Sequence, residues 1–189
     1  TLSRYRGRDP FCDPFCGSGT IPIEAALIAK NRAPGLDRSF AAQKWKTLPS
    51  SVWTDAAQEA MAREFHGSYD IWGGDIDPEA VALSRHNAEL AGVDGCVRFE
   101  VADAGKFHRD SEYGQLVTNP PYGERLLDRY QAEELYRAFG AAFRTMPPKW
   151  RAVILSSHTE FERCFGAPAD KRRKLYNGML RCDAFLYGR

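Results

Sequence analysis

Short apolar runs alternate with amphipathic stretches along the chain, a pattern that predicts strands separated by helices. Strands are expected at 11–15, 69–74, 96–101, 116–118 and 152–156. Helices are expected at 21–29, 54–65, 77–92 and 135–143. Two last strands, 174–176 and 179–187, flank Asn177-Gly178, a dipeptide typical of hairpin turns. This order predicts an α/β sandwich with a mostly parallel sheet and a C-terminal antiparallel hairpin.

Particular residue types indicate where the helices begin and end. Ser18 or Thr20 is expected to cap the first helix, because Ser and Thr are preferred at helix N-termini. Asp77 followed by proline is the cap-then-proline order of another helix start, and Gly92 ends that helix.

A stretch rich in Pro, Gly and basic residues, 31–51, is expected to be a loop excursion. Its Trp45, and Trp53 just beyond it, are interpreted as anchors in the core or in the loop rather than as platforms for bases.

Composition narrows the class of protein. With 189 residues the chain predicts about one domain, and 43% hydrophobic residues make disorder a poor interpretation. The net charge of +1 excludes a histone-like polycation. No apolar run reaches the roughly 20 residues of a membrane helix. Residues 1–8 show no signal peptide.

The cysteines and histidines point to a reduced protein without a metal. Five cysteines without a CxxC pair favour free thiols and a cytoplasmic location. The four histidines are scattered, so no metal site is expected.

Chemistry is expected just after each strand, because ligands of such sheets bind at the carboxyl ends of the strands. The first strand leads into Asp-Pro-Phe-Cys-Gly-Ser-Gly-Thr at 13–20. Its glycines let the backbone approach a ligand beside the free N–H groups of a helix start, although an ordinary tight turn is the alternative. Pro22 stands where an NAD fingerprint has its third glycine, which disfavours an NAD oxidoreductase.

The second and third strands are each followed by a carboxylate. Asp75 can accept both hydroxyls of a ribose, and Ile76 beside it can lie against an adenine face. Asp77 is interpreted as a helix cap instead. Asp103 can accept a proton of an adenine amino group, with a turn aspartate as the alternative.

The fourth strand ends at Asn119-Pro120-Pro121-Tyr122. The prolines fix the backbone, so the Asn119 side-chain oxygen and the Pro120 carbonyl are held as two acceptors for an exocyclic amine. Tyr122 offers a flat face on which a base can stack. A proline-rich turn is the alternative for the tetrapeptide alone.

In this order the motifs resemble S-adenosylmethionine-dependent amino-group methyltransferases. Longer strings narrow the resemblance to the THUMP-associated rRNA guanine-N2 methyltransferases: IPIEAA (21–26), APGL (33–36), NPPYGERL (119–126) and KLYNG (174–178). The likeness covers about residues 2–187. It implies a Rossmann-like class I methyltransferase fold with a seven-stranded sheet, helices on both faces, and one domain over 1–189. Family members carry an N-terminal THUMP region, so an isolated catalytic domain is expected.

The resemblance also implies roles for individual residues. Asp13 would lie near the cationic end of the cofactor, Asp75 would bind its ribose, and Asp103 would accept its adenine amino group. S-adenosylmethionine is expected to contact Asp13, Pro14, Phe15, Cys16, Gly17, Ser18, Gly19, Thr20, Asp75, Ile76, Asp103, Ala104 and Asn119. The catalytic residues are expected to be Asn119, Pro120, Pro121 and Tyr122.

The function implied is methylation of guanine N2 in 23S rRNA by a monomeric enzyme. Adenine-N6 methylation of DNA is an alternative, but 189 residues hold no recognisable target-recognition domain. A non-catalytic nucleic-acid-binding module is the third interpretation, and the intact 119–122 segment opposes it.

Two basic clusters remain open between two interpretations. Arg4, Arg6 and Arg8 form one cluster, and 171–174 forms the other. They are either a solvated face and a protected sheet edge or a track for RNA phosphates. Arg125 and Arg129 are closer to Tyr122 and better placed to touch the substrate.

Overall fold

The computed structural model describes residues 2–122 and 129–188 and is built around one seven-stranded sheet. Its strands are β1 (Phe11–Asp13), β2 (Ile71–Asp75), β3 (Arg98–Val101), β4 (Tyr113–Thr118), β5 (Lys149–Ser156), β6 (Lys171–Asn177) and β7 (Leu180–Tyr187). Their order is β3-β2-β1-β4-β5-β7-β6. The first five strands are parallel, and β7 pairs antiparallel with both β5 and β6. The predicted α/β fold with its C-terminal antiparallel hairpin is therefore confirmed.

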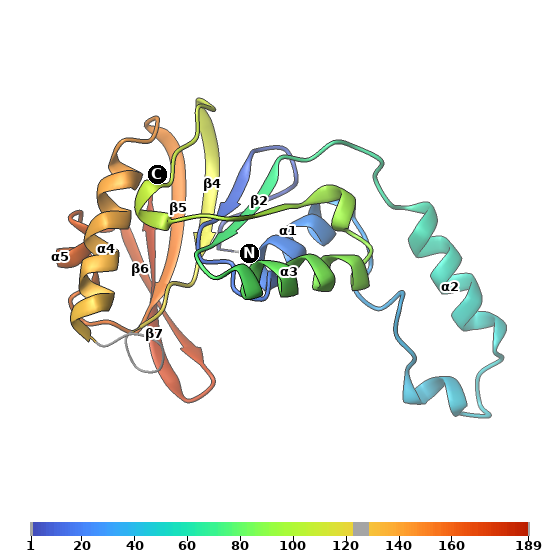
Figure 1. Ribbon diagram of the computed structural model, residues 1–189. Coiled ribbons are helices and arrows are strands. Elements are labelled where there is room, and N and C mark those ends of the chain that lie inside the picture. Colours follow the sequence, from blue (N-terminus) through green and yellow to red (C-terminus); the bar gives the residue numbers. More distant parts are fainter. Residues whose placement is uncertain (1, 123–128, 189) are drawn as a thin grey trace.

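Helices cover both faces of the sheet, as predicted (Figure 1). They are α1 (Thr20–Lys30), α2 (Ser51–Ala62), α3 (Pro78–Leu90), α4 (Arg129–Arg144) and α5 (Phe161–Phe165), with 3-10 turns η1 (Ala41–Lys44), η2 (Asp94–Cys96) and η3 (Ala104–Lys106). α1 and α3 pack on one side of the sheet, and α4 and α5 pack on the other. None of the helices in these described ranges is both long and apolar enough to cross a bilayer.

Each side of the sheet has its own apolar core. On the α4 and α5 side, Tyr136, Phe139, Phe161 and Phe165 are completely buried and their rings contact one another. On the other side, the alanine-rich buried face of α1 packs with Phe99 and its neighbours. The sheet is thus buried on both faces, as is usual for parallel strands.

The start of α1 differs from the sequence prediction. Its N-cap is Gly19, in the left-handed conformation with φ 83°, and no side chain caps the helix. The hydroxyls of Ser18 and Thr20 lie 3.3 Å from each other. The capping prediction was wrong because a hydroxyl caps from the N-cap position itself, and a glycine occupies that position. Asp77, by contrast, is confirmed as a cap, because its carboxylate accepts from Glu79 N at 2.9 Å.

The hairpin turn is shifted by one residue from its predicted place. Asn177 still pairs with Leu180, so the two-residue turn is Gly178-Met179. Gly178 has φ 62°, which suits the first central position of a primed turn. Lys171–Asn177 is the edge strand of the sheet, so basic side chains at 171–174 fit the interpretation as a protected edge.

Residues 33–63, which we call the arm, extend away from the sheet between α1 and β2 (Figure 1). The arm carries η1 and α2, and α2 buries none of its residues. The loop excursion predicted at 31–51 is thus present, and the helix that follows begins at Ser51, three residues before the predicted start.

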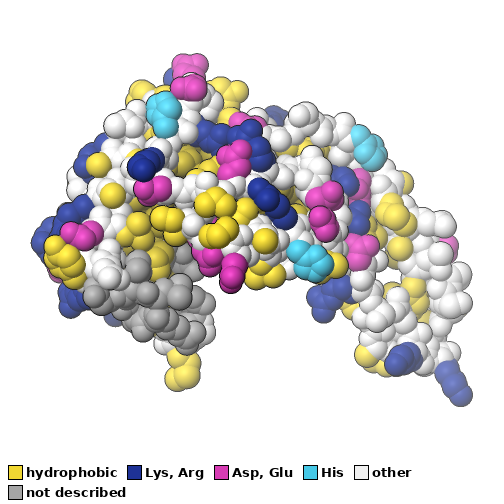
Figure 2. All heavy atoms as spheres, in the orientation of Figure 1, with side chains coloured by type: hydrophobic (Ala, Val, Ile, Leu, Met, Phe, Trp, Pro, Cys, Tyr) yellow, Lys and Arg dark blue, Asp and Glu magenta, His cyan; other side chains and the backbone are white. Residues whose placement is uncertain are grey.

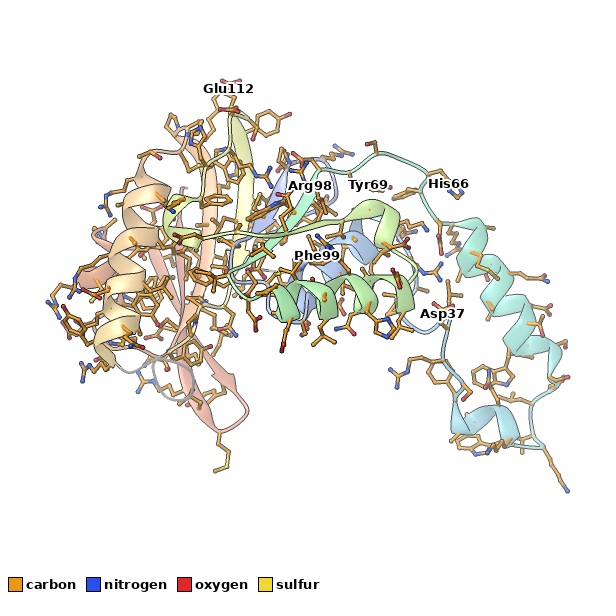
Figure 3. The ribbon with its side chains drawn as sticks, viewed as in Figure 1. Asp37, His66, Tyr69, Arg98, Phe99 and Glu112 are labelled. Atoms are coloured by element: carbon orange, nitrogen blue, oxygen red, sulfur yellow. The ribbon has the colours of Figure 1, made fainter. Side chains whose placement is uncertain are left out.

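Hydrogen bonds and ion pairs fix the base of the arm. Arg32 pairs with Glu64 at 2.6 Å and with Asp37 at 2.8 Å, and Lys30 reaches Glu64 at 3.1 Å. The Phe65 N–H donates to the Lys30 carbonyl at 2.7 Å. Figure 3 labels Asp37 and His66, which lie near the two ends of the arm. The arm therefore leaves the body at a fixed point.

Candidate functional site

A cavity of about 1080 Å³ opens at the carboxyl ends of the central strands. Its wall includes residues at the ends of four different strands: Pro14, Phe15 and Gly17 after β1, 75–77 at the end of β2, 102–104 after β3 and 119–122 after β4. From β1 the chain first adds β2 and β3 on one side and then returns to add β4 on the other side of β1. The switch point of the topology therefore lies between β1 and β4. That is the place where open α/β sheets bind ligands.

Most of the predicted site residues line this cavity. They are Pro14, Phe15, Gly17, Asp75, Ile76, Asp103, Ala104, Asn119, Pro120, Pro121 and Tyr122. The other five, Asp13, Cys16, Ser18, Gly19 and Thr20, do not belong to its wall. Asp13 and Cys16 are buried behind the turn. The structure thus brings the four motifs together along one edge of the sheet.

The glycine turn is tied to the end of β2 through one carboxylate. Asp75 accepts from Gly17 N at 2.9 Å with one oxygen and from Asp77 N at 3.0 Å with the other. Each carboxylate oxygen has a second lone pair, so Asp75 can still accept from a ligand hydroxyl in the cavity. Gly17 has φ 52°, and a Cβ there would meet nothing within 4 Å, so its backbone faces open space.

Asp13 lies beneath the cavity and links β1 to β4. Its carboxylate is 1% exposed and accepts from Thr118 Oγ1 at 2.5 Å and from Phe15 N at 3.1 Å. Burial raises the pKa of Asp13 to about 7, the two hydrogen bonds oppose that rise, and the nearby negative charge of Asp75 adds to it. A cation in the cavity would stabilise the ionised form of Asp13.

The residues after β2 and β3 supply an apolar surface and an acceptor. Ile76 is 71% exposed although it is apolar, so its side chain offers a surface that a flat ring could cover. Asp103 accepts from Gly105 N at 2.8 Å as the cap of η3, and its second oxygen lies 3.8 Å from Lys106 Nζ. The alternative role of Asp103 as a turn aspartate is therefore present, and the residue also lines the cavity.

The Asn119–Tyr122 segment is held by contacts from two sides. The Tyr122 hydroxyl donates to Asn119 Oδ1, and the Cys182 thiol of β7 lies 3.8 Å from the Tyr122 hydroxyl. The Tyr136 hydroxyl of α4 donates to the Pro121 carbonyl at 2.6 Å. Burial raises the pKa of Tyr136, which keeps its hydroxyl protonated as a donor.

Some cavity residues were not predicted from the sequence. Four come from one face of α4 and two come from elsewhere: Gln131, Glu134, Leu135 and Ala138, together with Ala80 and Leu180. The spacing of the four along α4 is that of a single helical face, so the sequence could have shown that they share a face but not what they face. The predicted substrate contact Arg125 and the 123–126 part of the NPPYGERL string lie outside the described residues. Arg129 begins α4 and lies 3.5 Å from Glu133.

This set of groups fits a nucleoside that bears a positively charged group. Asp75 offers carboxylate oxygens for a diol, Ile76 offers an apolar face for a base, and Asp103 offers an acceptor for an amino group. The buried carboxylate of Asp13 supplies negative charge beneath the same cavity. Asn119 lines the same cavity, so one space could hold both a nucleoside and a substrate group.

Comparisons with known proteins agree on the type of domain. The family model described as UPF0020, RMKL-like methyltransferase domain, matches residues 1–185. The "Putative RNA methyltransferase YpsC" of Bacillus subtilis is 40% identical over 98% of this chain and 48% of its own length. The "Ribosomal RNA large subunit methyltransferase K/L" of Shewanella baltica is 42% identical over 93% of this chain and 25% of its own length.

A solved structure supports the same conclusion. It is described as "SMU.472, a putative methyltransferase complexed with SAH", and it matches with a TM-score of 0.94 and 40% identity over 100% of this chain and 50% of its own. The present chain therefore spans about half the length of SMU.472 and YpsC, and about a quarter of the K/L protein.

Proposed function

The chain belongs to the UPF0020 family of RMKL-like methyltransferase domains, with S-adenosylmethionine as its cofactor, and we propose that it methylates guanine N2 in 23S rRNA. The observation that carries this proposal is the meeting of Asp75, Ile76 and Asp103 with Asn119 around one cavity. One cavity thus has groups suited to a nucleoside cofactor and two acceptors suited to a substrate amine. The 189 residues are proposed to act as one catalytic domain.

The proposed role of the 119–122 segment is to hold the substrate amine. Asn119 Oδ1 and the Pro120 carbonyl would each accept a hydrogen bond from one N–H of the amine, which turns the lone pair of the nitrogen toward the cofactor. Tyr122 stacks on the base. The bound cofactor supplies an electrophilic methyl group on sulfur. After accepting this methyl group, the nitrogen would release one proton to solvent.

Positioning is the main source of catalysis in this proposal. An amine conjugated to a base is a poor nucleophile, so alignment of the two reactants matters more than acid–base chemistry. Well-aligned reactants gain roughly 7–11 kcal/mol relative to free encounter. Tyr136 contributes by fixing the Pro121 carbonyl next to the two acceptors. The target base must be unpaired or flipped out, because pairing hides its amine.

The substrate class is supported by the relatives. One of them is named for methylation of large-subunit ribosomal RNA and another for methylation of RNA. DNA remains a second candidate, because the Asn-Pro-Pro-Tyr motif at 119–122 is shared with adenine-N6 methyltransferases. Both substrates present an exocyclic amine to the same acceptors.

The test is methyl transfer from radiolabelled S-adenosylmethionine to unmodified 23S rRNA and to duplex DNA. We expect label in the RNA, and mass analysis of its nucleosides should show N2-methylguanosine. N6-methyladenine in the DNA would establish the second candidate. Absence of transfer to both, with no cofactor binding by calorimetry, would instead show a non-catalytic module.

A further inference from the structure

The far end of the arm presents an exposed tryptophan between two cations. We call residues 38–53 the arm tip. Trp45 is 62% exposed and stands between Lys44 and Lys46 in the sequence. The interpretation of Trp45 as a core or loop anchor was therefore wrong. Trp53 does anchor the loop, because its ring stacks on Phe40 with 6.2 Å between centroids and 19° between planes.

The charge of the arm tip has one sign. The segment 38–50 contains three basic residues, Arg38, Lys44 and Lys46, and no acidic residue. Asp37, just before it, is paired with Arg32 at the base of the arm. Within residues 2–122 and 129–188, no ion pair involves the three basic side chains of the tip. Figure 2 shows dark blue side chains at this end of the molecule, next to hydrophobic ones.

The arm tip also lies on the side of the molecule that a substrate must approach. Strands β1, β2 and β4 end toward the lower side of Figure 1, where the cavity is lined. In Figure 1 the β6–β7 hairpin extends below that edge of the sheet, and the arm leaves the other side of the molecule and bends so that its tip also lies in the lower part of the view. The hairpin contributes Leu180 to the cavity wall and exposes Met179 completely. A substrate that contacts both the cavity and the arm tip must therefore be a long polymer and not a single nucleoside.

We propose that the arm tip binds a single-stranded segment of the RNA substrate outside the target nucleotide, with a base stacked on Trp45 and phosphates held by Lys44 and Lys46. This inference rests on the proposed RNA methyltransferase activity and deepens it. Bases stack on aromatic side chains whatever their sequence, and lysines that neutralise phosphates add affinity that depends on salt. The uncompensated positive charge selects a polyanion.

A protein partner fits the arm tip less well. The centres of protein–protein interfaces are depleted of lysine, whereas Trp45 has a lysine on each side. A protein that buried this tryptophan would therefore have to supply acidic side chains for both lysines. The base of the arm is fixed by the ion pairs of Arg32 with Glu64 and Asp37.

The experiment measures binding of a fluorescein-labelled single-stranded RNA of mixed sequence by anisotropy at several salt concentrations. Trp45→Ala should weaken binding on the order of 10-fold, and Trp45→Phe should restore most of that loss because a ring remains. The pair Lys44→Glu and Lys46→Glu should reduce the slope of log affinity against log salt by roughly 1.4. Affinity for S-adenosylmethionine, measured by calorimetry, should not change in any of these variants.

The control makes the same change of net charge at the opposite edge of the sheet. Lys149→Glu with Arg151→Glu alters the start of β5, near Glu112, which Figure 3 labels at the top of the view. This variant should keep the wild-type salt slope. Because Trp45 is exposed, Trp45→Ala should also keep the wild-type melting temperature, which separates a loss of binding from a loss of folding.

Several outcomes would overturn the inference. Wild-type RNA binding in Trp45→Ala and in the double lysine variant would do so, and so would failure of the wild-type chain to bind RNA. A wild-type dimer in sedimentation that Trp45→Ala dissociates, without any effect on RNA binding, would assign the tip to a second copy of the chain. Arm-dependent RNA binding without any methyl transfer would overturn the proposed activity and leave the arm inference standing.

Discussion

The hydroxyl of Tyr122 donates a hydrogen bond to the side-chain oxygen of Asn119. This oxygen is the atom proposed to accept a hydrogen bond from the substrate amine. An amide oxygen has two lone pairs, so Asn119 can hold Tyr122 and a substrate amine together. The bond also fixes which end of the Asn119 amide faces the cavity. The two side chains therefore act as a unit, in which the residue proposed to stack on the base also orients the proposed acceptor.

Asn119→Ala should abolish methyl transfer, because it removes one of the two proposed acceptors of the amine. Calorimetry should show nearly unchanged affinity for S-adenosylmethionine, since Asp75 and Asp103 remain in place. The measurement is single-turnover transfer of labelled methyl to RNA. Near-normal turnover would remove Asn119 from the mechanism.

Tyr122→Phe separates the two roles of Tyr122. The ring remains for stacking, but the hydrogen bond to Asn119 is lost. A neutral hydrogen bond contributes about 0.5–1.5 kcal/mol, so the rate should fall by roughly 2- to 10-fold. The rate of methyl transfer should fall much further in Tyr122→Ala, because stacking on the base is lost as well. Equal rates for these two variants would show that Tyr122 does not stack on the substrate.

Tyr136→Phe tests the support beneath the Asn119–Tyr122 segment. The Tyr136 ring is completely buried and would stay in place, while the Pro121 carbonyl would lose its donor. An unpaired polar group of this kind costs about 1–3 kcal/mol. We expect a lower kcat with unchanged cofactor affinity. Tyr113→Phe, at the exposed first residue of β4, serves as the control and should have no effect. A change in stability without a change in kcat would make Tyr136 purely structural.

Stability should depend on pH through Asp13. Its pKa is raised from 3.8 in the unfolded chain to about 7 in the folded protein. Between those values the folded state binds a proton that the unfolded state does not, so the free energy of unfolding falls as pH rises from about 4 to 7. The loss is on the order of a few kcal/mol. Asp13→Asn should lack this part of the pH dependence in urea titrations, and parallel curves for the two proteins would contradict the assignment.

Cofactor binding should report on the same carboxylate. If the cationic end of the cofactor lies near Asp13, binding lowers the pKa of Asp13. Binding slightly below pH 7 should then release protons, and calorimetry in buffers with different ionisation enthalpies detects this release. The Asp13→Asn variant should release fewer protons when it binds the cofactor. Equal release by both proteins would place the cation elsewhere.

Two glycines of the β1–α1 turn should respond differently to alanine. Both have positive φ, 52° at Gly17 and 83° at Gly19, and a left-handed alanine costs roughly 1–2 kcal/mol. A Cβ on Gly17 meets nothing within 4 Å, whereas a Cβ on Gly19 comes within 2.8 Å of Ser84 Cβ and 3.1 Å of Phe99. Gly19→Ala should therefore lower the melting temperature more than Gly17→Ala. The reverse order would mean that the turn is held differently.

The sequence was sufficient to predict which segments meet, because the rule behind that prediction is simple. The carboxyl ends of parallel strands share one edge of a sheet, so motifs after successive strands converge once the strands are placed. Asp75 and Asn119 are distant in the chain and still line one cavity. Asp77 was also recognised as a cap, because its signal lies in adjacent residues.

Features that depend on distant packing could not be predicted in this way. The contact of Tyr136 with Pro121 needs the position of α4 relative to the sheet. The exposure of Trp45 depends on whether the arm folds back or extends, and the order of residues does not specify that. The five-residue helix α5 is too short to show a period. The cap of α1 was misassigned because a left-handed glycine took the place of the neighbouring hydroxyls.

The bond from Phe65 N to the Lys30 carbonyl, 2.7 Å long, brings together the two ends of a segment of more than thirty residues. Close to the sheet, the connection between α1 and β2 is consequently as short as a tight loop. The length of the segment outside this contact therefore has little influence on the stability of the sheet, because the entropy cost of closing a loop grows only slowly with its length.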